Sequence, residues 1–206
     1  MRCYMLLVRP HGNLIQQIRA LKRLAMNWET DPLPMALPEG FICGWFDSQL
    51  SQARAISNET FSEEGYPGAG SKASNEQFFQ QALVQHAQEI CAALPDVFRF
   101  ESVVQRGGEI ILEFSRDIDS GKLQEAMHQF AHDAGLVCRE SPAGTYNGIW
   151  LGSGSLPELQ SPLSFKKYEL VLYLAELPES PLNGYYFKTI ARVHRKMPSH
   201  ARSRKE

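Results

Sequence analysis

The stretch over residues 97–141 constrains the fold more than any other part of the chain, because strand, turn and helix signals follow one another there without a break. Residues 97–105 are rich in β-branched and aromatic side chains. The glycine pair Gly107-Gly108 is typical of a two-residue hairpin turn. Residues 109–115 then alternate, with Glu109 and Glu113 on one face, which predicts the second strand of the hairpin.

A helix is expected directly after this hairpin. Asp119 or Ser120 can cap its N-terminus, and Gly135 stands where many helices end in a left-handed residue. Apolar residues recur between the two ends at helical spacing, namely Leu123, Met127, Phe130, Ala131 and Ala134. Residues 136–139 read as a strand that returns to the sheet. The whole unit indicates an α+β protein.

The rest of the chain adds further strands and helices. Residues 2–9 are apolar on both faces, which fits a central strand covered on both sides, or one that packs on a partner. We expect further strands over residues 41–46, 146–151, 167–177 and 185–193, and helices over residues 14–28, 47–56 and 75–94. In the first helix the pattern places Leu14, Ile18, Leu21 and Ala25 on the apolar face, and Arg19, Lys22 and Arg23 on the polar face.

This order of elements contains a ferredoxin-like core, and we expect a mostly antiparallel sheet with helices packed on one face. Residues 1–193 are interpreted as a single α+β domain with a mobile loop over residues 57–74. Residues 194–206 are basic, hold almost no hydrophobic side chains and are expected to form a disordered tail.

Cysteine usage and hydropathy predict a cytoplasmic location. The four cysteines lie far apart in the chain and form no C-x-x-C pair, which is typical of free thiols in a reducing compartment. No run approaches the ~20 apolar residues that a membrane span requires. The first residues lack the features of a signal peptide, so we expect no contact with a membrane.

The net charge of −2 hides an asymmetry. Residues 188–206 hold seven Lys/Arg and one acid, whereas residues 1–187 hold 14 Lys/Arg and 22 Asp/Glu. An acidic body suits a basic protein partner, although solubility alone also explains such a charge.

Motifs for catalysis and for cofactors are weak. The glycine-rich segment 65–72 differs from a phosphate-binding loop, because Ser71 separates Gly70 from Lys72. We find no nucleophile elbow and assign no catalytic residue. His128 and His132, with Glu125 one turn earlier, could line a metal-binding helix face, but no second cluster supplies further ligands. The sequence therefore predicts neither a metal nor another cofactor.

A resemblance to a known class of proteins emerges over residues 108–142. The polar-faced strand, the capped helix and the closing Ala134-Gly135-Leu136-Val137 resemble small α+β bacterial proteins of the polymorphic-toxin immunity type. The strand at residues 4–10 and the helix at residues 75–94 agree with this resemblance, whereas residues 146–206 depart from it. It implies a protein that inhibits a bacterial toxin by covering the toxin's active site.

The leading hypothesis is therefore a non-enzymatic module that binds a basic protein, and the resemblance implies that this protein is a toxin. Its predicted contacts are Glu59, Glu63, Glu64, Glu109 and Glu113. One alternative is a nucleic-acid-binding protein that uses the last strand and the tail, through Tyr185, Tyr186, Arg192, Arg195, Lys196, Arg202 and Arg204. Another is an enzyme whose site is assembled from scattered residues. The sequence leaves the oligomeric state open.

Overall fold

A computed structural model describes residues 2–26, 33–48, 72–116, 118–139, 147–178 and 184–195 of the chain. Its helices are α1 (Leu14–Ala25), α2 (Leu33–Ala36), α4 (Lys72–Ala92) and α5 (Ser120–Asp133). Its strands are β1 (Arg2–Pro10), β2 (Phe41–Ser48), β3 (Phe98–Arg106), β4 (Glu109–Phe114), β5 (Leu136–Cys138), β6 (Gly148–Gly152), β7 (Leu163–Phe165), β8 (Tyr168–Glu176) and β9 (Tyr186–His194).

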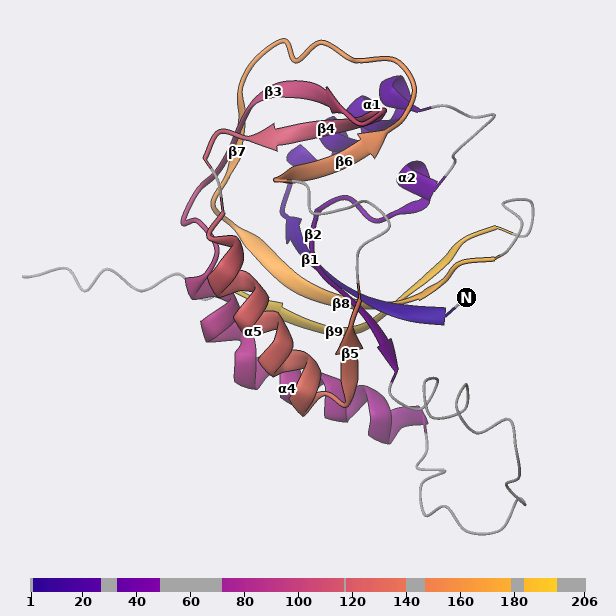
Figure 1. Cartoon of the computed structure of the whole chain (residues 1–206), viewed down its shortest axis with the longest axis vertical. Coiled ribbons are helices and arrows are strands. Elements are labelled where there is room, and N and C mark those ends of the chain that lie inside the picture. Colours follow the sequence, from indigo (N-terminus) through magenta and orange to yellow (C-terminus); the bar gives the residue numbers. More distant parts are fainter. Residues whose placement is uncertain are drawn as a thin grey trace, which may run out of the picture.

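The strands form two antiparallel sheets (Figure 1). One has five strands in the order β5-β2-β1-β8-β9, and the other has four in the order β6-β4-β3-β7. The expected α+β class and antiparallel pairing are confirmed. The strands form two sheets, however, and not one. β5 does not return to the sheet of β3 and β4, because it pairs with β2, with Cys138 opposite Phe46. The unit over residues 97–141 is thus shared between the two sheets.

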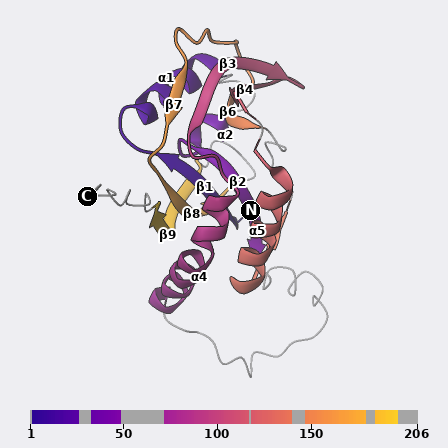
Figure 2. The same ribbon diagram turned by 90° about the vertical axis from the view of Figure 1, so that its left-hand side faces the viewer.

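The helices are also divided between the sheets. α4 and α5 pack against each other beside the five-stranded sheet, where α4 contacts β9 and α5 contacts β2 and β5 (Figure 2). α1 and α2 instead contact β6 of the four-stranded sheet. The expectation of helices on one face therefore describes α4 and α5, but not α1 and α2.

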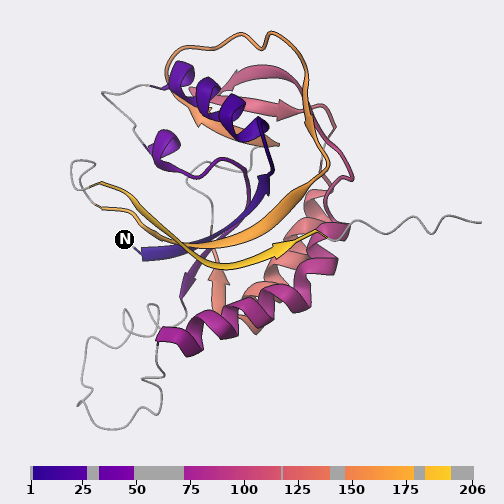
Figure 3. The ribbon, with the colours of Figure 1, turned by 180° about the vertical axis from the view of Figure 1, so that it is seen from behind.

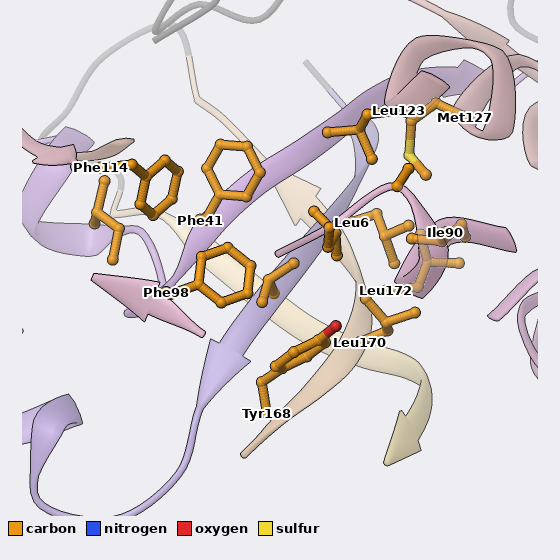
Figure 4. Packing of buried hydrophobic residues seen from close by; sticks show 14 of the residues in the cluster. Leu6, Phe41, Ile90, Phe98, Phe114, Leu123, Met127, Tyr168, Leu170 and Leu172 are labelled. Atoms are coloured by element: carbon orange, nitrogen blue, oxygen red, sulfur yellow. The ribbon is translucent and has the colours of Figure 1, made fainter. Parts of the chain in front are cut away.

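β1 lies at the centre of the five-stranded sheet and is buried on both faces, as its sequence predicts. Leu6 and Val8 enter the larger core, whereas Met5 and Leu7 enter a second core. In the larger core, strand residues meet Ile90 of α4 and Met127 of α5 at one end, and aromatic side chains of both sheets at the other (Figure 4). One core cluster therefore joins the two sheets.

The local signals around the β3–β4 hairpin are confirmed. Gly107 and Gly108 have φ values of 58° and 92°, and Arg106 pairs with Glu109 across the turn. This is a two-residue turn that only glycine-like residues adopt without strain. The Asp119 side chain accepts a hydrogen bond from the Lys122 backbone N–H at 3.1 Å and so caps α5.

Several local expectations are wrong. The helix expected over residues 47–56 does not begin at Asp47, because this residue continues β2 and pairs with Arg139 at 2.9 Å. Residues 49–56 lie outside the described residues. His194 is the last residue of β9, and not part of a tail. The short strand β7 lies between the strands expected over residues 146–151 and 167–177, where no strand was predicted. α4 begins at Lys72, inside the loop that was expected over residues 57–74. The other residues of that loop, 57–71, lie outside the described residues.

Candidate metal centre

The two predicted partner contacts within the described residues are already engaged inside the molecule. The Glu109 carboxylate accepts a hydrogen bond from the Trp150 indole N–H at 2.6 Å. Glu113 forms an ion pair with Arg106 of the neighbouring strand. Ile111 between them is 2% exposed, so this face of β4 is not an open edge. Glu59, Glu63 and Glu64 lie outside the described residues and stay predictions.

Only some of the predicted nucleic-acid contacts are among the described residues. Tyr186 and Arg192 are exposed on β9, and Tyr185 packs against the second core. The Arg195 guanidinium lies 5.3 Å from the centre of the Tyr168 ring and pairs with Asp96, which indicates a structural role for this arginine. Lys196, Arg202 and Arg204 lie outside the described residues.

A row of polar side chains that the sequence did not single out crosses the five-stranded sheet. Arg9 of β1 is opposite Glu169 of β8, and Glu169 is opposite His194 of β9. Strand alternation puts these side chains on the same face as Leu7 and Val171, where the second core ends. The row therefore lies where the apolar face of the sheet meets solvent. The strands that supply it, β1, β8 and β9, are neighbours in the five-stranded sheet (Figure 3).

His11 joins this row from the residue that follows β1. Its backbone N–H donates to the Lys167 carbonyl at 3.3 Å, which fixes the chain as it leaves the sheet. Gly12 then adopts a φ of 75° and turns the chain toward α1. The His11 ring consequently stacks on the His194 ring, with the two ring centres 5.6 Å apart.

The ligand atoms of His11, Glu169 and His194 lie within 4.8 Å of one another. His194 Nδ1 is 3.6 Å from Glu169 Oε2. Metal–ligand bonds of about 2.1 Å at tetrahedral angles place neighbouring ligand atoms roughly 3.4 Å apart. The histidine–glutamate pair already has this separation. Because both histidines are exposed, their rings are able to rotate and close the remaining distance.

The carboxylate at the centre of the row is almost fully buried, with 6% of its side chain exposed. Arg9 Nη1 lies 3.4 Å from Oε1, so one oxygen is held by the guanidinium while the other faces His194. A ligating carboxylate is commonly oriented by such an outer partner. The pKa of the neighbouring Tyr173 hydroxyl is raised by burial, and Arg9 opposes that rise.

The donor set indicates which ions this arrangement suits. Two imidazole nitrogens and one carboxylate oxygen favour Zn²⁺ and neighbouring divalent transition metals over Mg²⁺ or Ca²⁺, which prefer oxygen ligands. Three protein ligands leave at least one coordination position for water or another ligand. Among the residues that the structure describes, no other group of three His, Cys, Asp or Glu side chains has this proximity.

The histidines that the sequence did single out are not part of this group. His128, His132 and Glu125 are all exposed on α5, as expected for a solvated helix face. His11, Glu169 and His194 have no common spacing in the sequence, since strand register alone brings them together. Only knowledge of the pairing of β1, β8 and β9 could have revealed them.

Comparison of the chain with protein-family models, with curated proteins and with solved structures gives no match in any of the three. The described helices include none that is both long enough and apolar enough to cross a membrane.

Proposed function

We propose that this chain binds a divalent transition-metal ion through His11, Glu169 and His194. The observation that carries the proposal is the convergence of three ligand atoms within 4.8 Å from three separate parts of the chain. The buried carboxylate, oriented by Arg9, supplies a fixed anchor, and the two exposed imidazoles close on the ion from the solvent side.

The competing explanation for the cluster is a structural ion-pair network. In that case Glu169 holds Arg9 and His194, and the closeness of His11 has no chemical role. The two explanations differ in what the exposed histidines do. His11 and His194 are needed for binding a metal ion, whereas the ion pair between Arg9 and Glu169 needs neither.

Zinc titration of the full chain by calorimetry distinguishes the two. The proposal predicts one ion per chain, with affinity at least tenfold weaker in His11→Ala and in His194→Ala, because each removes one ligand. The control is the double variant His128→Ala/His132→Ala, which removes two exposed histidines from α5 and is expected to bind zinc normally. Equal affinity in all three variants and the unaltered chain would mean adventitious binding, and no zinc binding at all would also refute the proposal.

A second candidate function, binding of a basic protein, is supported by where the acids occur. The described residues contain 16 Lys/Arg and 14 Asp/Glu, so the charge of this part of the chain is nearly balanced. The remaining segments within residues 1–187 contain eight acids and one base, and these acids include Glu59, Glu63 and Glu64. The negative charge that would attract a basic partner is therefore concentrated in these segments.

Charge reversal tests this second candidate. We expect Glu63→Lys/Glu64→Lys to abolish capture of a basic protein from a cell lysate. The control Glu101→Lys/Glu125→Lys, at two exposed acids among the described residues, is expected to retain it. The resemblance to immunity proteins makes a secreted bacterial toxin the partner to look for. Capture that survives reversal at residues 63 and 64 removes this segment from the proposal, and capture that nuclease abolishes favours nucleic acid instead.

A further inference from the structure

Arg192 stands beside the proposed metal centre on the same face of the sheet. It precedes His194 by two residues on β9, so both side chains project from one face. Its backbone N–H and C=O both bond to the Gln80 side chain of α4, each at 2.9 Å, which fixes the position of the strand. Its side chain is exposed, and among the described residues no carboxylate pairs with its guanidinium.

With a divalent ion bound, the charge around the proposed metal centre would be strongly positive. Arg9 Nη1 lies 3.4 Å from the Glu169 carboxylate, and strand alternation places the Arg192 side chain on the same face of the sheet. A divalent ion bound by one carboxylate and two neutral imidazoles keeps one positive charge, and the two arginines add two more. Such a site favours an anion in its open coordination position.

We propose that the metal-loaded site binds an oxyanion, with one oxygen on the ion and another on the guanidinium of Arg192. The inference rests on the metal binding proposed above. A planar guanidinium binds phosphate and carboxylate groups through paired hydrogen bonds, so either group satisfies the geometry. The exposure of His11, Arg192 and His194 leaves the ion accessible to a ligand from solvent. The expected ligand is therefore a small phosphorylated or carboxylated molecule.

Cobalt as a spectroscopic probe tests this inference on the full chain. The chain is kept in excess over Co²⁺ so that no free ion remains, and inorganic phosphate or acetate is then added in separate titrations. We expect a saturable change in the visible Co²⁺ spectrum, because the oxyanion replaces a coordinated water. The anion whose titration saturates at the lower concentration identifies the preferred group.

The variant Arg192→Gln distinguishes an anion that binds both the ion and Arg192 from an anion that binds the ion alone. This variant is expected to bind Co²⁺ as the unaltered chain does, but to bind the anion at least tenfold more weakly. The control is Arg99→Gln, which removes an exposed arginine from β3 of the other sheet and is expected to change neither. Absence of Co²⁺ binding refutes the metal proposal itself. Normal Co²⁺ binding without any anion response, or with an equal response in Arg192→Gln, overturns this inference alone.

Discussion

Lys22 shows how a single residue departs from the pattern of its helix. The sequence places it with Arg19 and Arg23 on the polar face of α1, but its side chain is 2% exposed. It follows Ile18 by four residues and therefore lies on the same side of the helix. Its ammonium group donates to the Leu37 carbonyl at 2.9 Å, which gives the buried amine one hydrogen-bond partner.

Burial lowers the pKa of Lys22 to about 8, and nearby Arg19 lowers it further while Glu39 opposes the shift. Below pH 8 both the folded and the unfolded chain carry the proton, and the cost of the buried charge is fully present. As the pH rises from about 8 to about 10.5, only the unfolded chain keeps the proton, so this cost disappears and stability rises. A shift of this size corresponds to a cost of about 3 kcal/mol.

Substitution Lys22→Met tests this description. We expect the free energy of unfolding at pH 7 to increase by about 1–2 kcal/mol, because removal of the buried charge outweighs loss of the hydrogen bond to Leu37. The advantage of the variant should shrink between pH 8 and pH 10.5. Urea unfolding at a series of pH values measures both effects, and a variant that is less stable than the unaltered chain at pH 7 would contradict the description.

At the scale of elements, a buried histidine connects α4 with α5. His86 of α4 is 4% exposed, and its Nε2 lies 2.8 Å from Asp133 Oδ2 at the end of α5. Its Nδ1 lies 3.3 Å from Glu89 Oε2. Hydrogen bonds from His132 and then from His86 hold the pKa of Asp133 below its usual value. The ionised carboxylate therefore links the two helices.

The stabilisation by Asp133 is present above the pKa that this group has in the unfolded chain, about 4, and is lost as the pH falls through the lower folded value. We expect Asp133→Asn to lower the free energy of unfolding at pH 7, and the difference from the unaltered chain to shrink below pH 4. Glu125→Gln, on the exposed face of the same helix, is the control and should leave stability unchanged. If the two substitutions changed the free energy of unfolding equally, Asp133 would not link the two helices.

Local signals predicted most of the elements well, for reasons visible at particular residues. Gly107, Gly108, Asp119 and Gly135 each act within a few residues, and the structure places each in the predicted turn or cap. β7 was missed because its pairing with β3 joins residues far apart in the sequence. The expected start of a helix at Asp47 was wrong because an aspartate after an apolar run is compatible with both a strand and a helix N-terminus.

At the scale of the whole molecule, the division into two sheets could not be read from the order of elements. The strand after α5 could pair with either sheet, and its pairing with β2 is a long-range choice that core packing decides. The same holds for the candidate metal centre. Glu169 lies at its centre because β8 pairs with both β1 and β9. The spacing of residues in the sequence does not indicate which strands are neighbours in the sheet.

The most direct measurement is anomalous diffraction at the zinc absorption edge from crystals of the full chain grown with Zn²⁺. The account predicts a peak within about 2.0–2.2 Å of one nitrogen of His11, one nitrogen of His194 and an oxygen of Glu169, as zinc bond lengths require. A zinc ion held instead by His128 and His132, or by cysteine sulfur, would contradict the proposed centre. So would crystals in which this cluster binds no zinc while Arg9 and His194 both remain on Glu169.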